Sequence, residues 1–155
     1  MDLQPGSPAP QFSIPTDNDR VFSLKEHLGK KIVLYFYPKD NTSGCTQQAL
    51  DFKEQLAKFQ HHNCLVLGIS KDSLASHNRF STKYELPFDL GSDPDKKACQ
   101  LYNVLVQKTL YGRAYEGIDR STFLINEKGQ IEKVWRSVKV NNHVNEVLKC
   151  LKSLP

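Results

Sequence analysis

The stretch KIVLYFYPKDNTSGCTQQALDFKEQLAKF, residues 31–59, decides the fold of this chain. Its first part, residues 31–37, is rich in β-forming side chains and apolar on both alternating faces, which predicts a central strand covered on two sides. Pro38 ends this strand, and a polar loop follows. Beyond the loop, apolar residues recur at steps of four and three, the spacing of one helix face: Cys45, Ala49, Phe52, Leu56 and Phe59. The stretch therefore predicts a buried strand followed directly by an amphipathic helix.

Two further apolar runs, residues 64–70 and 121–125, repeat the pattern of the first strand. Residues 126–129 then turn the chain into residues 130–135, where apolar and polar side chains alternate as in the second arm of a hairpin. Because a helix connects the first two strands, we expect them to be parallel with a right-handed connection.

Two more segments are predicted to be helices. Residues 73–84 form one, with Ser73 as its cap, and residues 142–154 form the other. The buried side of the last helix carries Val144, Val147, Leu148 and Leu151. With the strands, this order predicts an α/β fold in which helices flank both faces of a central sheet. Such sheets place reactive groups at the carboxyl ends of strands, where helices begin.

The composition fits one compact domain, residues 1–155. Hydrophobic residues make up 39% of the chain, charged residues make up 25%, and the mean hydropathy is −0.51. Each apolar run ends well before the roughly 18 residues that a membrane-spanning helix needs, so we expect no membrane segment.

The N-terminal sequence lacks the pattern of a secretory signal, which predicts a cytoplasmic protein with reduced thiols. The net charge of +4 comes with scattered lysines, so we expect no nucleic-acid binding.

Cysteines stand at positions 45, 64, 99 and 150, without a Cys-x-x-Cys pair, which fits neither a zinc site nor a disulfide scaffold. Cys45 differs from the others because it lies in the first turn of a predicted helix. There, unpaired backbone N–H groups and the helix dipole favour an anion and lower the pKa of a thiol. Position alone leaves a second interpretation open, in which Cys45 only begins the apolar stripe of the helix.

The residues around Cys45 resemble a known family. Pro38, Thr42 and Cys45 reproduce the Pro-x-x-x-Thr-x-x-Cys motif of the peroxiredoxins, which are thiol peroxidases on a thioredoxin-like fold. Four strings resemble the bacterioferritin comigratory protein or peroxiredoxin Q group, in matching order over nearly the whole chain: GSPAPQF (6–12), YPKDNTSGCT (37–46), LGIS (67–70) and GIDRSTFLIN (117–126). The resemblance implies a thioredoxin-like fold with a central mixed β-sheet flanked by helices.

The resemblance also implies roles for four residues. Cys45 is the peroxidatic cysteine, which reacts with hydrogen peroxide or an organic hydroperoxide. Thr42 hydrogen-bonds its sulfur and the peroxide, although the same residue also suits the N-cap of the helix. Pro38 shields the pocket, and Arg120 supplies a second positive group just before a strand. No metal, flavin or nucleotide signature accompanies these residues, so we expect chemistry by thiol alone, without a cofactor.

Elementary chemistry supports those residue types. At pH 7.4 a thiol of pKa about 8.5 is roughly 7% ionised. A lowered pKa can therefore raise the thiolate fraction only about tenfold. Further acceleration must come from donors that stabilise negative charge on the departing oxygen. The candidates are Arg120, Thr42 and the backbone N–H of Gly44 or Cys45. Arginine suits this role because its planar fork can hold sulfur and peroxide oxygen together.

Both usual positions of a second, resolving cysteine are vacant. Many members of the group carry it five residues after the first, where this chain has Leu50, and others carry it in the next helix, at Ser81 here. The simplest hypothesis is a one-cysteine mechanism in which thioredoxin, glutaredoxin or glutathione reduces the oxidised Cys45. A two-cysteine mechanism with Cys99 as the resolver remains an alternative. We expect Cys64 to be part of the core and Cys150 to lie at the edge of a buried helix face.

Two other classes of protein remain open. In a peroxide sensor, oxidation of Cys45 would change binding to a partner, and in a thioredoxin-like exchange module there would be no peroxidase activity. The missing Cys-x-x-Cys disfavours the second. Resemblance to the group favours a monomer. Gln48 either orients Arg120 or is exposed. Lys39 and Asp40 fit the strings of the group, and a solvated loop pair explains them equally well. His77 suits a capping or solvated position.

Overall fold

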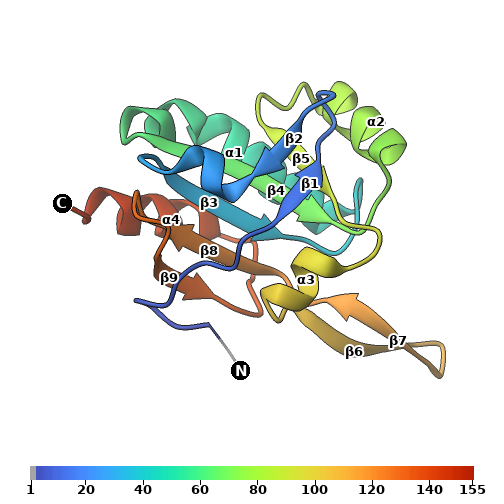
Figure 1. The fold of residues 1–155 in the computed structure, drawn as a ribbon. Helices are drawn as coiled ribbons and strands as arrows, with labels where there is room; N and C mark the ends of the chain where they lie inside the picture. The colour runs from blue at the N-terminus through green and yellow to red at the C-terminus, as the bar shows by residue number, and fades with distance from the viewer. Residues whose placement is uncertain (1–2) are drawn as a thin grey trace.

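A five-stranded mixed sheet forms the centre of the computed structural model, which describes residues 3–155 (Figure 1). The strand order is β5-β4-β3-β8-β9. The strands are β3 (Lys31–Phe36), β4 (Cys64–Ser70), β5 (Asp89–Ser92), β8 (Ser121–Ile125) and β9 (Ile131–Trp135). The three apolar runs and the hairpin predicted from the sequence are therefore confirmed as β3, β4, β8 and β9.

The central strand β3 pairs in parallel with β4 and antiparallel with β8. Residues 32–36 are all buried, as expected for a strand covered on both faces. The antiparallel pairing has a consequence for the site, since it places Ser121, at the start of β8, opposite Phe36, at the end of β3. Residues just before β8 therefore lie beside the loop that follows β3.

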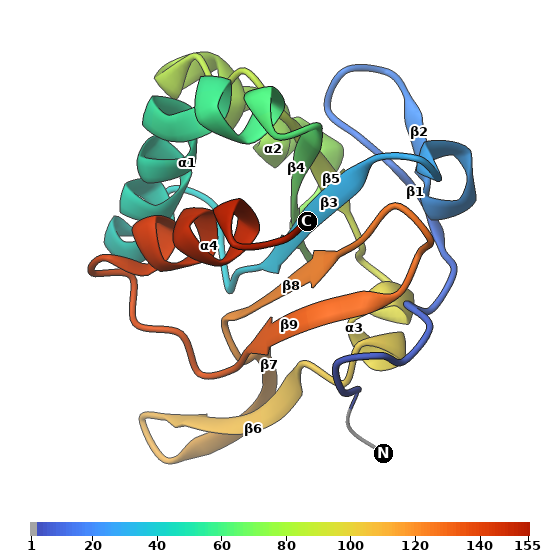
Figure 2. The ribbon, with the colours of Figure 1, turned by 90° about the vertical axis from the view of Figure 1, so that its left-hand side faces the viewer.

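Three helices cover one face of the sheet (Figure 2). They are α1 (Ser43–His61), α2 (Leu74–Tyr84) and α4 (His143–Lys152). The predicted apolar stripe of α1 is buried, and Ser73 caps α2 by accepting a hydrogen bond from the Ser76 backbone N–H at 3.1 Å. All three predicted helices are confirmed.

The second face of the sheet is covered by shorter elements (Figure 2). They are the hairpin of β1 (Ser13–Pro15) and β2 (Val21–Ser23), the 3-10 helix η1 (Leu24–His27) and the short helix α3 (Lys97–Leu101). The sequence predicts cover on this face but not the N-terminal hairpin that supplies much of it. Within residues 3–155, no helix is long and apolar enough to cross a membrane.

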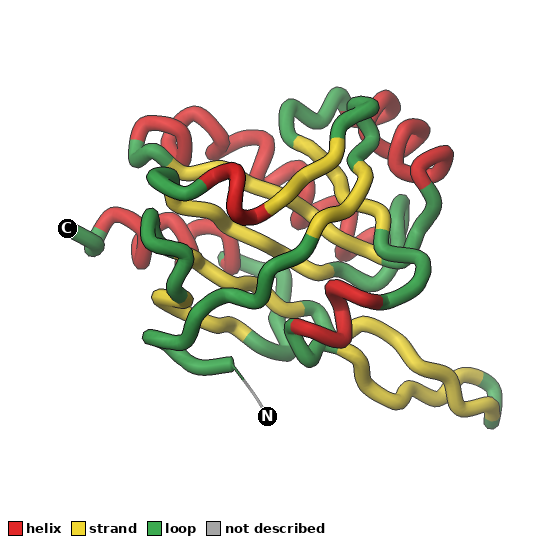
Figure 3. The backbone as a smooth tube through the Cα atoms, viewed as in Figure 1, coloured by secondary structure: helices red, strands yellow, loops and turns green. Residues whose placement is uncertain are grey.

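A second hairpin, β6 (Leu105–Leu110) and β7 (Arg113–Ile118), extends away from the body of the molecule (Figures 1 and 3). Its turn has positive φ angles at Tyr111 (52°) and Gly112 (78°), as a two-residue hairpin turn requires. Most of its side chains are at least partly exposed, so its sequence carries no alternation of buried and exposed positions. The sequence analysis therefore did not predict it.

Candidate active site

Cys45 lies where the sequence places it, in the first turn of α1 beyond the carboxyl end of β3. Its side chain is 1% exposed. Thr42 is the N-cap residue of α1 in an extended conformation, and its carbonyl oxygen accepts the first helical hydrogen bond, from the Thr46 N–H at 2.8 Å. Cys45 therefore lies at a helix start, where unpaired backbone N–H groups and the helix dipole favour negative charge.

Arg120 approaches the sulfur from the segment before β8. Its Nη2 donates to Cys45 Sγ at 3.4 Å, and its Nη1 donates to Gln48 Oε1 at 2.7 Å. Gln48 is completely buried one turn after Cys45, so the exposed alternative is wrong, and the residue contacts Arg120 as the other interpretation expects. The two contacts hold the plane of the guanidinium against the thiol.

Gly44 leaves the space that Arg120 occupies. A Cβ at this position would lie 3.2 Å from Arg120 Nη2, which is tighter than an ordinary van der Waals contact. A side chain here would require the guanidinium to shift by a few tenths of an ångström. The glycine before the cysteine thus has a steric function that the sequence motif alone does not reveal.

Thr42 and Pro38 complete the set of predicted site residues. Pro38 follows β3 and is half-buried. The Thr42 hydroxyl donates to the Lys39 carbonyl oxygen at 2.9 Å, and residues 3–155 contain no hydrogen bond between Thr42 and Cys45. In this conformation the hydroxyl proton stabilises the loop rather than the sulfur.

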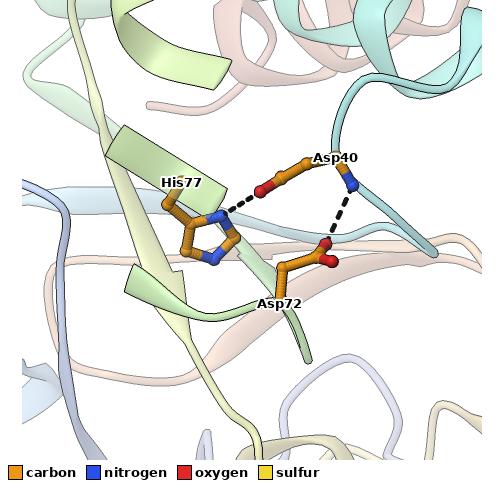
Figure 4. Close-up of side chains that lie close together, drawn as sticks. All are labelled: Asp40, Asp72 and His77. Atoms are coloured by element: carbon orange, nitrogen blue, oxygen red, sulfur yellow. Dashed lines mark hydrogen bonds and ion pairs between the residues drawn. The ribbon is translucent and has the colours of Figure 1, made fainter. Parts of the chain in front are cut away.

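A buried polar network anchors the loop that leads to Cys45 (Figure 4). Asp40 Oδ2 lies 2.7 Å from His77 Nδ1, and the Asp40 backbone N–H donates to Asp72 Oδ2 at 2.8 Å. His77, in α2, is completely buried, and its Nε2 lies 3.0 Å from the Gly91 carbonyl oxygen. The solvated interpretations of Asp40 and His77 are therefore wrong.

The surroundings of Asp40 favour its charged form. Burial alone would raise the pKa of this carboxyl, but hydrogen bonds from His77, Tyr37 and Ser76 lower it below its ordinary value. Both nitrogens of His77 face oxygen acceptors, so both can donate only when the ring carries two protons. The pair thus forms a short, buried hydrogen bond between the active-site loop and α2.

The same three side chains also have the composition of a metal site, because ligand atoms of Asp40, Asp72 and His77 lie within 4.8 Å of one another. Their polar atoms are already engaged, however. Asp72 Oδ2 accepts from the Ser70 hydroxyl at 2.7 Å as well as from the Asp40 N–H, and His77 bonds directly to Asp40. The arrangement fits a hydrogen-bonded anchor better than a metal site.

The other cysteines are poorly placed to react with Cys45. Cys64 begins β4 opposite Lys31, at the far end of β3, and burial raises the pKa of its thiol to about 12. Cys99 packs in the apolar cluster on the face of the sheet opposite to the cluster that contains Cys45. Burial and the neighbouring Asp93 raise its pKa. Cys150 is half-buried at the edge of the α4 face, as expected.

His143, at the start of α4, also lies near the site. Its Nε2 is 2.8 Å from Thr122 Oγ1, two residues after Arg120. Burial, and secondly the positive charge of Arg120, lower the pKa of His143 to about 4. The sequence analysis did not select His143, because its partner lies on a strand that only the fold brings beside α4.

Comparison with known proteins shows the family to which the chain belongs. Residues 5–134 match the model of the AhpC/TSA family. The chain is 48% identical to a putative peroxiredoxin bcp of Coxiella burnetii, over 96% of this chain and 98% of that protein. It is 41% identical to peroxiredoxin Bcp of Bacillus subtilis, over 99% and 98%.

Solved structures give the same result. Xanthomonas campestris peroxiredoxin Q matches with a TM-score of 0.88 and 40% identity, covering 92% of this chain and 90% of that one. A cysteine-to-serine mutant of Xylella fastidiosa PrxQ matches with a TM-score of 0.93 and 37% identity, over 99% and 98%. The expected thioredoxin-like fold is thereby confirmed. The chain belongs to the AhpC/TSA family, as a peroxiredoxin of the bacterioferritin comigratory protein or peroxiredoxin Q group.

Proposed function

We propose that Cys45 is the peroxidatic cysteine of a thiol-dependent peroxidase that reduces hydrogen peroxide and organic hydroperoxides. The observation that carries this assignment is the Arg120 guanidinium, which donates to Cys45 Sγ at 3.4 Å while Gln48 fixes its orientation. A solved relative supports organic hydroperoxides as substrates, because the Xanthomonas campestris bacterioferritin comigratory protein, 40% identical, has alkyl peroxide reduction activity.

In the first step, the Cys45 thiolate attacks the terminal oxygen of the hydroperoxide. An S–O bond forms as the O–O bond breaks, and the electron pair of that bond leaves with the second oxygen, which takes a proton to become an alcohol or water. Sulfur is thereby oxidised to sulfenic acid. Arg120 keeps its charge throughout and offers a second N–H to the departing oxygen.

Thr42 and Pro38 act on the substrate in this mechanism. The Thr42 hydroxyl turns from the Lys39 carbonyl oxygen to the peroxide when substrate enters, and Pro38 shields the reacting atoms from water. The backbone N–H groups at the start of α1 add donors that need no rearrangement. The support for Thr42 is its position at the N-cap, one helical turn before the sulfur.

In the second step, an external thiol reduces the sulfenic acid. Its thiolate attacks Cys45 Sγ, a mixed disulfide forms and water leaves; a second thiol then releases the Cys45 thiolate and a disulfide. One hydroperoxide and two thiols thus give an alcohol, water and one disulfide. The burial of Cys99 on the opposite face of the sheet supports this one-cysteine mechanism over an internal resolver.

The reductant is thioredoxin, glutaredoxin or glutathione, and the protein acts as a monomer in the cytoplasm, with residues 1–155 as one domain. No second function is favoured by a contact of the site. A peroxide-sensing role would appear as oxidation of Cys45 without turnover when any of these reductants is supplied.

The test is peroxide consumption by two cysteine variants. Cys45→Ser should abolish consumption in the presence of a thiol, because it removes the attacking sulfur. Cys150→Ser is the matched control, since its half-buried thiol lies outside the site, and it should keep the wild-type rate. Consumption that survives Cys45→Ser would overturn the assignment of Cys45.

A further inference from the structure

A cavity of about 280 Å³ separates the active-site loop from the protruding hairpin β6–β7. Pro38 and Lys39 line it from the loop, Lys71 and Asp72 from the segment after β4, and Lys108 and Tyr115 from the hairpin. Three lysines thus converge on one cavity that Pro38 borders. Pro38 begins the loop that leads to Cys45 in the first turn of α1, although Cys45 itself does not line the cavity.

Two of these lysines are held in place by the backbone of β7. Lys71 Nζ donates to the Glu116 carbonyl oxygen at 2.9 Å, and Lys108 Nζ donates to the Ile118 carbonyl oxygen at 2.8 Å. Each ammonium group has three N–H donors, so each keeps two for a ligand. Ile118 lies only two residues before Arg120, which contacts the sulfur.

Gly117 makes the path of Lys108 possible. A Cβ at position 117 would lie 2.8 Å from Lys108 Cδ, so the lysine stem crosses β7 where the strand has no side chain. The fold therefore directs this ammonium group toward the junction of the hairpin and the Arg120 segment.

The cavity lining carries three lysines and one carboxylate, that of Asp72. Within the described residues 3–155, no carboxylate forms an ion pair with Lys39, Lys71 or Lys108. Asp72 is the acidic residue in the lining, and one of its oxygens already accepts from the Ser70 hydroxyl and the Asp40 N–H. Like charges gathered in a cavity raise its affinity for an anion.

We propose that this cavity binds the carboxylate of a small-molecule reactant and holds its reactive end toward Cys45. The inference rests on the proposed peroxidase function, whose two reactants are a hydroperoxide and a thiol. A carboxylate is the anionic group that organic molecules of both kinds commonly carry. Either a hydroperoxy acid in the first step or a carboxylate-bearing thiol in the second would use the three lysines.

The test compares acids with their neutral methyl esters. In the first arm, a hydroperoxy fatty acid and its methyl ester compete as oxidants; in the second, 3-mercaptopropionate and its methyl ester compete as reductants after oxidation by hydrogen peroxide. We expect the wild-type protein to prefer the acid about fivefold or more in one arm, as a partly buried ion pair allows. The arm that shows the preference identifies the ligand.

Charge removal should abolish that preference. The triple variant combines Lys39→Met, Lys71→Met and Lys108→Met. In this variant we expect equal rates for acid and ester, and an unchanged rate with hydrogen peroxide and 2-mercaptoethanol. Lys128→Met is the matched control, because this exposed lysine lies in the β8–β9 turn, and it should keep the preference. Equal rates for acid and ester in both arms of the wild type, or a preference that survives in the triple variant, would overturn the proposal.

Two further measurements keep the test decisive. If the triple variant fails to fold, Lys39→Met alone serves, because the Lys39 side chain makes no hydrogen bond within the described residues, and about a twofold loss of preference is expected. If the wild type consumes no hydrogen peroxide, the proposed function fails by itself. Octanoate binding then tests separately whether the cavity binds a carboxylate, and the amide NMR signals of Lys71, Lys108 and Gly117 report on it. Signals that do not shift at millimolar octanoate would refute the proposed carboxylate site.

Discussion

In the proposed mechanism, Arg120 acts through geometry as much as through charge. Its fork contacts Cys45 Sγ with one nitrogen and Gln48 Oε1 with the other, and Gly44 leaves room for it. A lysine at this position would keep the positive charge but would offer a single point of contact. The identity of the residue is therefore testable separately from its charge.

Substitution Arg120→Lys should slow oxidation of Cys45 by hydrogen peroxide about 10- to 100-fold at neutral pH, because the donor to the departing oxygen is lost. Stopped-flow mixing of the reduced protein with peroxide measures this rate. Arg136→Lys is a suitable control, since Arg136 donates to the Asn103 and Tyr102 carbonyl oxygens instead of the site. A rate within twofold of the wild type would exclude the proposed function of Arg120.

Sequence reasoning identified the contact between Gln48 and Arg120 only in part. Cys45 and Pro38 carry a local motif, whereas the contact between Gln48 and Arg120 joins residues 72 positions apart. The helical phase places Gln48 one turn after Cys45, but whether it is buried depends on the strand that brings Arg120 beside it. The motif therefore pointed to Cys45, and the fold was needed to decide between the two interpretations of Gln48.

At the scale of elements, the pair Asp40 and His77 joins the β3–α1 loop to helix α2 (Figure 4). Their side chains are 4% and 0% exposed, so the pair is shielded from water and from salt. Removing one member of a buried pair leaves the other polar group without a hydrogen-bond partner. This destabilises the folded protein more than replacing both members does. The loop that carries Cys45 should therefore depend on His77, a residue in another element.

A double-mutant cycle with Asp40→Asn and His77→Gln measures this dependence. We expect a coupling of about 1–3 kcal/mol in the free energy of unfolding, obtained from urea denaturation of the four proteins. The single variants should also slow peroxide oxidation of Cys45, because the loop loses its anchor. Additive effects on unfolding, with no coupling between the two sites, would show that the contact contributes nothing specific.

The elements also show where sequence patterns carry information. Strand β3 is buried on both faces and leaves a continuous apolar run in the sequence, and helix α1 is buried on one face and leaves a helical period. The hairpin β6–β7 has no buried face over most of its length and leaves no such period. Its turn at Tyr111–Gly112 was the only local signal, and a tyrosine with positive φ is not an expected turn residue.

At the scale of the whole molecule, the sheet separates two apolar clusters, and polar groups buried beside them make stability depend on pH. His143 illustrates this, because its pKa is lowered from 6.5 to about 4 in the folded protein. Between these values the unfolded chain binds more protons than the folded one. The free energy of unfolding should therefore fall as the pH is lowered from 6.5 toward 4.

The expected loss from His143 is on the order of 3 kcal/mol over that window. Urea denaturation at a series of pH values measures it, and His143→Gln should flatten the slope between pH 6.5 and 4. His61→Gln, at the exposed end of α1, should leave the slope unchanged. The lowered pKa of Asp40 acts in a separate window, since its contribution is lost only as the pH falls below its ordinary value of 3.8. An unchanged slope in His143→Gln would contradict the assignment.

The central claim is that Cys45 alone reacts with peroxide and that an external thiol restores it. The most direct measurement is the intact mass of the reduced protein after one equivalent of hydrogen peroxide and a sulfenic-acid trap, with peptide mapping of the product. A single trapped adduct on Cys45, with Cys64, Cys99 and Cys150 unmodified, is the predicted result. A disulfide between Cys45 and another cysteine would contradict the one-cysteine mechanism, and consumption of peroxide with Cys45 unmodified would contradict the assignment of the reactive residue itself.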